Sequence, residues 1–135
     1  MNAVDTNVLV YLHDTRDAVK QGQAAALVGS LSNGVLIWQV ACEYIAAARK
    51  LKHIGVSEQE IWTNLRLLER SWKPIFPEWI HLDRAEQLIQ RHSLSFWDAL
   101  IIAVALESGV TTLYSEDLVG LGSFPGLQLV NPFVP

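Results

Sequence analysis

Short apolar runs alternate with longer amphipathic segments along this chain, and this alternation constrains the fold more than any other feature. The runs at residues 1–5, 35–38, 110–114 and 127–130 have the length and composition of buried strands. Buried strands connected through helices form parallel sheets that are covered on both faces. The sequence therefore predicts an α/β fold in three layers, with helices on both sides of a mostly parallel central sheet.

The segments between these runs have helix start and stop signals. Helices are predicted from Asp17 to about residue 31, over residues 40–53, from Ser57 to about residue 72, over residues 82–92, and from Ser95 to Gly109. Ser57 and Glu60 have the spacing of a capping box, and Pro74 and Pro77 break the chain. Residues 8–12 either extend the first strand or form a helix, because periodicity alone does not distinguish the two.

Size and composition indicate one globular domain over residues 1–135. Half of the residues are hydrophobic and 18% are charged, which argues against disorder. The net charge of −4 disfavours nonspecific coating of nucleic acid, so any contact with nucleic acid must be local.

The sequence predicts a cytoplasmic protein that does not enter a membrane. No apolar run approaches the roughly 18 residues of a membrane span. Asp5 and Asn7 fall where the apolar part of a secretory signal would lie. The single cysteine, Cys42, has no partner in the chain, which fits a reducing compartment, and we expect it to be buried as a small hydrophobe.

Four acidic residues, Asp5, Glu43, Asp98 and Asp117, lie in apolar or tightly structured surroundings. Burying an unpaired carboxylate costs several kcal/mol, so buried acids normally have partners. No comparable set of Arg or Lys residues accompanies them, which leaves metal ions as partners. Two divalent cations balance four carboxylates, and this arithmetic predicts a two-metal site that cleaves phosphodiesters.

The predicted topology brings these acids to one rim of the sheet. Asp5 ends the first strand and Asp117 follows a later one, at the carboxyl ends where functional groups gather. Asp98 lies in the first turn of its helix, and Glu43 projects from the helix after the second strand. We therefore expect the carboxylates to converge.

The donor set favours Mg²⁺ or Mn²⁺ over zinc, because hard divalent ions prefer oxygen ligands. In the predicted mechanism one ion activates a water for attack on the phosphate, and the other stabilises the leaving oxygen. Thr6, Asn7 and Ser115 are expected to support the ligand carboxylates through hydrogen bonds. Glu116 is expected to lie outside the ligand set, because neighbouring side chains diverge.

Three motifs, at residues 4–11, 96–103 and 115–118, together with Glu43, resemble those of PIN domains over essentially the whole chain. Length and motif order are most similar to the VapC toxins of VapBC toxin–antitoxin pairs. The resemblance implies a Mg²⁺-dependent ribonuclease, generally dimeric, that acts on RNA and is inhibited by a cognate antitoxin. It also implies that residues 8–12 form a short helix. The residues that it marks as the acidic quartet and its supports are Asp5, Glu43, Asp98 and Asp117, and Thr6, Asn7 and Ser115.

Each acid also has a structural interpretation when it is taken alone. Asp98 has the position of the capping-box acid of Ser95. Glu43, on an Ala-rich helix, has the spacing for a solvent-exposed pair with Arg49 or Lys50. The order and spacing of all four acids favour the metal site.

Basic and aromatic residues suggest contacts beyond the acids. Arg49, Lys50 and Lys52 form the densest basic stretch and are candidates for guiding an RNA backbone, although such runs are often hydrated helix ends. Most of the tryptophans are expected to be core residues or dimer anchors, and Trp97, next to Asp98, is equally compatible with base stacking. The residues expected to be core or dimer anchors are Trp38, Trp62, Trp72 and Trp79.

Other enzyme classes fit the sequence less well. A phosphatase of the haloacid dehalogenase kind needs a second Asp where Asn7 stands, and no residue compels the phosphoacceptor pocket of a receiver module. Gly120 and Gly122 lack the rest of a nucleotide-binding fingerprint. The serious alternative is a catalytically silent PIN-like module that binds RNA or protein, although such a module has no need for four clustered carboxylates.

Overall fold

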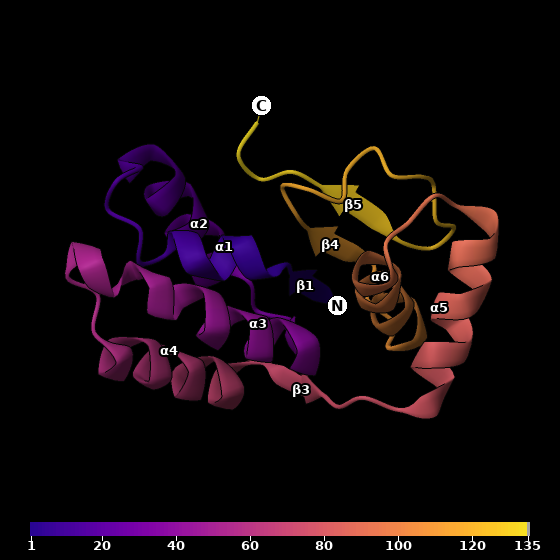
Figure 1. Ribbon diagram of the computed structural model, residues 1–135, viewed down its shortest axis with the longest axis horizontal. Coiled ribbons are helices and arrows are strands. Elements are labelled where there is room, and N and C mark those ends of the chain that lie inside the picture. Colours follow the sequence, from indigo (N-terminus) through magenta and orange to yellow (C-terminus); the bar gives the residue numbers. More distant parts are fainter. Residues whose placement is uncertain (135) are drawn as a thin grey trace.

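Five short parallel strands form the centre of the computed structural model, which describes residues 1–134 (Figure 1). Their order in the sheet is β3-β2-β1-β4-β5, and every neighbouring pair is parallel. The strands are β1 (Asn2–Val4), β2 (Gly34–Ile37), β3 (Lys73–Ile75), β4 (Thr112–Tyr114) and β5 (Gln128–Val130). Pro135, the last residue of the predicted domain, lies outside the described residues.

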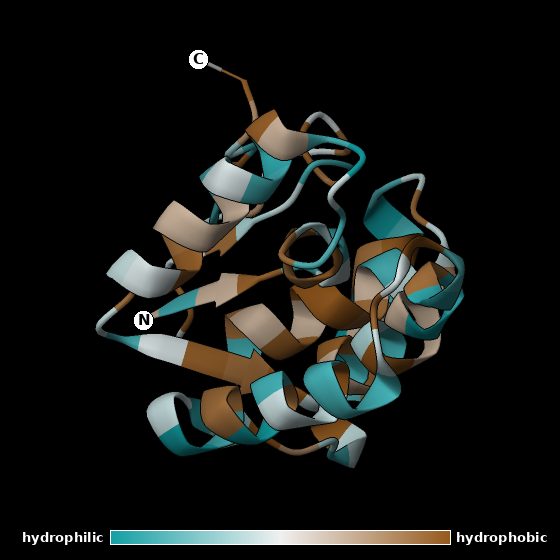
Figure 2. Cartoon of the chain, turned by 90° about the vertical axis from the view of Figure 1, so that its left-hand side faces the viewer, coloured by the Kyte–Doolittle hydropathy of each residue, from teal (hydrophilic) through white to brown (hydrophobic). Residues whose placement is uncertain are grey.

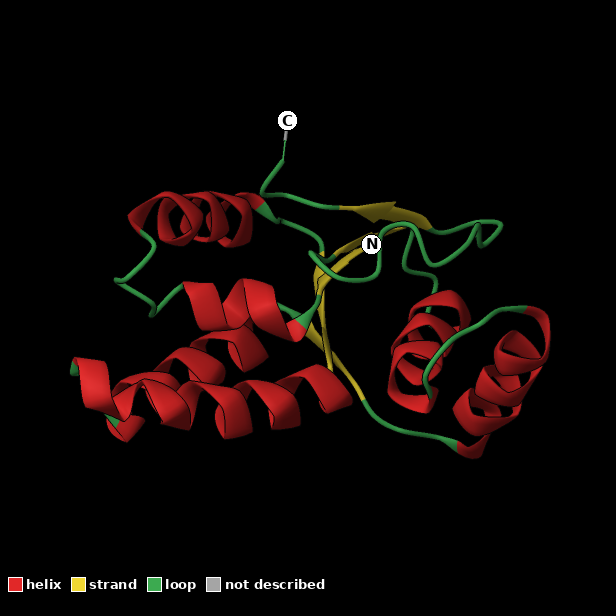
Figure 3. Ribbon diagram, turned by 45° about the horizontal axis from the view of Figure 1, so that its top comes forward, coloured by secondary structure: helices red, strands yellow, loops and turns green. Residues whose placement is uncertain are grey.

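Helices cover the sheet on both sides, with α1 to α4 on one side and α5 and α6 on the other (Figure 3). They are α1 (Thr6–Tyr11), α2 (Ala18–Ser30), α3 (Trp38–Ala48), α4 (Glu58–Ser71), α5 (Trp79–Arg91) and α6 (Phe96–Glu107), and the 3₁₀ helix η1 (Arg49–Ile54) follows α3. The predicted three-layer α/β fold is confirmed. Within residues 1–134, no helix is both long enough and apolar enough to cross a membrane.

Several element boundaries differ from the prediction for local reasons. Residues 8–12 lie mostly in α1, which starts directly after β1 with Asp5 as its N-cap. Helix α3 begins at Trp38, and the end of the predicted 40–53 helix tightens into η1 before Gly55, which adopts φ 95°. Helix α5 begins at Trp79 because Glu78 forms a capping box with His81.

Strand β3 was not predicted, because Pro74 lies within it. Proline lacks a backbone N–H and is tolerated in edge strands, and β3 is an edge strand of the sheet. The predicted capping box of α4 is only half formed. Ser57 accepts a hydrogen bond from the Glu60 backbone N–H, but the Glu60 carboxylate contacts His13 instead.

The core lies between the sheet and the two helical layers, and apolar stretches lie on the strands and on the inward parts of the helices (Figure 2). Trp72 is buried at 6% exposure, and a Cβ atom at Gly34 would lie 2.6 Å from its indole ring. Gly34 therefore makes room for the Trp72 side chain.

The other tryptophans in the predicted core set are exposed. Trp38, Trp62 and Trp79 are 52%, 44% and 81% exposed, so the core interpretation is wrong for them, and their role as dimer anchors stays a prediction. Cys42 is also exposed, contrary to expectation. Its position on α3 directs it toward a surface cavity instead of the sheet.

Candidate metal centre

Strands β1 and β4 lie side by side and bring distant acidic segments to the same edge of the sheet. Val4 pairs with Tyr114 in the parallel register, and the Asp5 N–H donates a hydrogen bond of 2.8 Å to the Tyr114 carbonyl. Asp5 thus leaves the sheet next to Ser115, and Asp117 follows two residues later. The carboxyl ends of parallel strands are where ligands bind in such sheets.

All four predicted acids line one surface cavity of about 430 Å³. They come from the end of β1, from the middle of α3, from the first turn of α6 and from the loop after β4. The lining residues are Asp5, Thr6, Asn7, Glu43, Ala46, Ala47, Lys50, Asp98 and Asp117. The small side chains of α3 leave this space open.

Asp5 is held from both sides by hydrogen bonds. Its Oδ1 accepts from the Thr6 backbone N–H at 2.7 Å, and its Oδ2 accepts from the Ser115 hydroxyl at 2.8 Å. Ser115 is fully buried, and its Oγ also accepts from the backbone N–H groups of Asp117 and Leu118. One hydroxyl therefore orders both Asp5 and the loop that carries Asp117.

Two neighbouring side chains of α1 contact Glu43 and Asp117. The Thr6 hydroxyl donates to Oε2 of Glu43 at 3.0 Å, and Nδ2 of Asn7 donates to Oδ2 of Asp117 at 2.7 Å. Because α1 follows β1 directly, the backbone turn at Asp5 directs these donors at carboxylates from two other segments.

The carboxylates lack positive partners among residues 1–134. None of the four takes part in an ion pair, whereas acids elsewhere, such as Glu58 and Glu69, do. Burial raises the pKa of Asp5; hydrogen bonds from Ser115 and Thr6 lower it in part, and the nearby carboxylates of Glu43 and Asp117 raise it further. Four acidic residues and one basic residue, Lys50, line the cavity, so its formal charge is negative.

The structural interpretations of Asp98 and Glu43 are not supported. The Ser95 hydroxyl accepts from the Asp98 backbone N–H, but the Asp98 carboxylate makes no return bond to Ser95. Glu43 is hydrogen-bonded by Thr6 instead of pairing with Arg49, which contacts Glu58 at 3.3 Å.

The donor set suits a hard divalent cation, because it consists of carboxylate oxygens at the rim of one cavity. In the described residues, however, no three Asp, Glu, His or Cys side chains are placed so that they could together hold one ion. Ligation of Mg²⁺ by one or two carboxylates, with water molecules completing the shell, needs no such group of three. The four acidic residues fit a divalent cation both in their oxygen ligands and in their location around one cavity.

The candidate RNA contacts separate into one residue at the cavity and two elsewhere. Lys50 lines the acidic cavity. Arg49 is paired with Glu58, and Lys52 is exposed but does not line the cavity.

Glu116 does not line the acidic cavity, although it is the neighbour of Asp117 in the chain. Its side chain is paired with Lys20 of α2 and accepts a hydrogen bond of 2.7 Å from the Tyr11 hydroxyl. These contacts, which sequence reasoning missed, anchor the loop that carries Asp117 to α1 and α2. Contacts between segments 96 residues apart leave no local pattern in the sequence.

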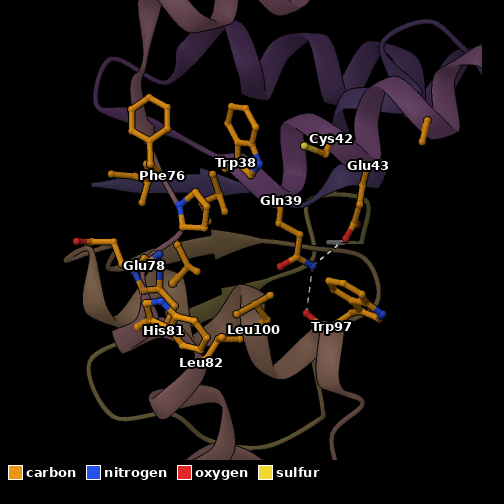
Figure 4. Close-up of a pocket in the computed structure, with 16 residues that line it drawn as sticks. Trp38, Gln39, Cys42, Glu43, Phe76, Glu78, His81, Leu82, Trp97 and Leu100 are labelled. Carbon is orange, nitrogen blue, oxygen red and sulfur yellow. Dashed lines mark hydrogen bonds between the residues drawn. The ribbon is translucent and has the colours of Figure 1, made fainter.

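Figure 4 shows the residues that line a larger apolar cavity of about 790 Å³. This cavity adjoins the acidic one, and the two share Glu43 and Ala46. Exposed aromatic side chains of α3, α5, α6 and the segment between β3 and α5 line it, together with Cys42. These aromatics are Trp38, Phe76, Trp79 and Trp97. This apolar surface is therefore a candidate binding site.

Sequence comparison finds that the PIN domain family model matches residues 3–119. Comparison with curated proteins gives no significant match.

Solved structures similar to this one include proteins of toxin–antitoxin pairs. A toxin–antitoxin complex from Klebsiella pneumoniae has a chain with a TM-score of 0.71 and 21% identity, covering 98% of both chains. VapC20 from Mycobacterium tuberculosis, a toxin that cleaves the sarcin-ricin loop, has a TM-score of 0.70 and 20% identity, covering 95% of this chain and 99% of its own. VapBC2 from Rickettsia felis, bound to a promoter DNA fragment, has a TM-score of 0.61 and 16% identity, covering 95% and 96%. These likenesses establish a shared fold.

Proposed function

Because this chain belongs to the PIN domain family, we propose that it is a Mg²⁺- or Mn²⁺-dependent endoribonuclease and the toxin of a type II toxin–antitoxin pair. The observation that carries the proposal is the single cavity lined by Asp5, Glu43, Asp98 and Asp117 without any ion pair among residues 1–134. A module that only bound RNA would gain nothing from repelling carboxylates, because RNA is itself an anion.

These four carboxylates would hold the cations. Bound divalent ions supply a more acidic water and neutralise charge on the phosphodiester. The remaining residues position the carboxylates: Ser115 and Thr6 fix the orientation of Asp5, and Asn7 fixes that of Asp117. Their hydrogen bonds leave less conformational freedom to be lost when a cation binds.

Lys50 is the proposed RNA contact at the site. Its side chain lines the cavity and forms no ion pair among residues 1–134. Its ammonium group is therefore available to a phosphate of the RNA backbone. Arg49 and Lys52 would attract RNA through their positive charge without contacting it at the acidic cavity. A substrate that approaches over Lys50 would present its phosphate to the acids of the same cavity.

The antitoxin is the proposed occupant of the apolar cavity. This cavity continues into the acidic one through Glu43 and Ala46, so a segment with apolar anchors and one basic side chain matches both surfaces. Two of the similar solved structures are toxin–antitoxin assemblies. Co-expression of the adjacent open reading frame should suppress toxicity, and unchanged toxicity would count against this partner.

A homodimer in the cytoplasm completes the proposal. Trp79, which is 81% exposed, and the other exposed aromatics are candidates for its interface. Either the dimer interface or the antitoxin could cover each aromatic side chain. Comparing the exposure of the tryptophans in the free protein and in its complex with the antitoxin distinguishes the two.

RNA cleavage by the purified protein tests the function. With Mg²⁺, the wild type should cut RNA and Asp98→Asn should not, because the amide removes a negative ligand. Asp83→Asn, which alters an exposed acid on α5, should cut like the wild type. Sequencing of the RNA ends in cells expressing wild type or Asp5→Asn would then identify the target. Equal cleavage by the wild type and Asp98→Asn would overturn the assignment.

A further inference from the structure

Gln39 joins two elements that carry candidate ligands. It lies in the first turn of α3, one turn before Glu43. Its Nε2 donates a hydrogen bond of 2.7 Å to Oε1 of Glu43 and one of 3.2 Å to the backbone carbonyl of Trp97 in α6 (Figure 4). Asp98 is the next residue after Trp97. One amide group therefore links the Glu43 carboxylate to the helical turn that carries Asp98.

The position of this amide is unfavourable for stability alone. Its Oε1 is buried and has no hydrogen-bond partner among residues 1–134. A buried acceptor without a partner costs about 1–3 kcal/mol, whereas an apolar side chain of similar shape would avoid this cost. An apolar side chain could not donate the two hydrogen bonds that Nε2 of Gln39 donates to Glu43 and to the Trp97 carbonyl.

Glu43 is held at both oxygens as a result. Thr6 donates to Oε2 and Gln39 donates to Oε1, so the carboxylate is fixed from α1 on one side and from its own helix on the other. The bond to the Trp97 carbonyl fixes the distance between α3 and the start of α6. Both restraints act at the rim of the acidic cavity.

We propose that Gln39 is a positioning residue that presets Glu43 and the Asp98 turn for divalent cations. This inference rests on the proposed metal-dependent function. Gln39 does not itself line the acidic cavity; it lines the adjoining apolar one. Its effect on the cations is therefore indirect, through the placement of two carboxylates.

Gln39→Met tests the proposal, and the chain offers a matched control. Gln23 of α2 also has a buried Oε1 without a partner among the described residues, but it does not line the acidic cavity. Mn²⁺ affinity of the full-length protein is measured by calorimetric titration, and the melting temperature is measured without metal. We expect Gln39→Met to weaken Mn²⁺ binding about 10–100-fold, as loss of outer-shell partners does, and to leave the melting temperature unchanged or higher. Gln23→Met should bind Mn²⁺ like the wild type.

A second variant removes the donor without adding a charge. Gln39→Leu also lacks the two bonds that Nε2 donates to Glu43 and to the Trp97 carbonyl, and it should also weaken Mn²⁺ binding. Wild-type affinity in both Gln39 variants would overturn the inference, and so would equal losses in Gln39→Met and Gln23→Met. If Mn²⁺ binds and Gln39→Met weakens it but the wild type cuts no RNA, the nuclease proposal fails while the role of Gln39 stands. If the wild type binds no Mn²⁺, both fail.

Discussion

The Ser115 hydroxyl donates a hydrogen bond of 2.8 Å to Oδ2 of Asp5, although 110 residues separate them. The contact exists because β1 and β4 are parallel neighbours, which places the residues after both strands side by side. Ser115 is fully buried, so its hydroxyl is shielded from solvent. The bond therefore connects the segment after β1, which carries Asp5, to the segment after β4, which carries Asp117.

Ser115→Ala should lower both stability and metal affinity. The change leaves Oδ2 of Asp5 and the N–H of Leu118 without their partner, and a loss of this kind costs about 1–3 kcal/mol of unfolding free energy. Chemical denaturation measures the loss. Ser30→Ala removes an exposed hydroxyl that donates to the Leu27 carbonyl and should change stability little. Equal stability of the two variants would show that the buried hydroxyl has no special role.

Asp5→Asn should make the stability of the metal-free protein less dependent on pH. Burial raises the pKa of Asp5 above its ordinary value of 3.8, so the folded protein holds this proton more tightly than the unfolded chain. The stability that this group contributes is fully present below pH 3.8 and is lost as pH rises through the raised folded pKa. The neutral amide avoids that loss.

Thermal melts in a chelator, with and without added Mg²⁺, measure this effect. Without metal, the melting temperature of Asp5→Asn should fall less than that of the wild type when the pH is raised from acidic to neutral, although the amide gives up one of the two oxygens that accept hydrogen bonds from Thr6 and Ser115. Added Mg²⁺ should raise the melting temperature of the wild type but not that of the variant. Equal pH dependence of the two melting temperatures would show that the folded protein does not hold the Asp5 proton more tightly than the unfolded chain.

Lys50→Gln should weaken RNA binding more than Lys52→Gln. Both residues lie in η1, but only Lys50 lines the acidic cavity. Loss of a phosphate contact reduces the salt dependence of binding by about one unit of slope. Binding of a labelled RNA across a series of salt concentrations gives that slope for each variant. If both variants keep the wild-type slope, RNA does not pass over Lys50.

The layers of the fold were predictable because apolar runs and helix caps are local signals. Residues 35–38 and 110–114 have the buried-strand pattern, and Ser95 has the expected cap contact with α6. The candidate site followed from topology, since acids after parallel strands must lie at one edge. Glu43 and Asp98 reach the same cavity from α3 and α6, so their placement also depends on how these helices pack.

Other features depend on tertiary contacts that leave no local pattern. Strand β3 forms because β2 offers a free edge, which overrides the break expected from Pro74. Glu60 leaves its capping box for His13, which lies in another segment. The contact between Gln39 and Glu43 could be predicted from their spacing of four residues on a helix. The contact between Gln39 and the Trp97 carbonyl could not, because it depends on how α6 packs against α3.

Titration of Mn²⁺ into the wild type and into amide variants of the four acids tests the central claim most directly. The variants are Asp5→Asn, Glu43→Gln, Asp98→Asn and Asp117→Asn, with Asp83→Asn as the control. The wild type and the control should bind Mn²⁺ saturably, and each of the four variants should bind at least about tenfold more weakly, because each removes a proposed ligand charge. Wild-type affinity in all four variants would contradict the shared metal centre.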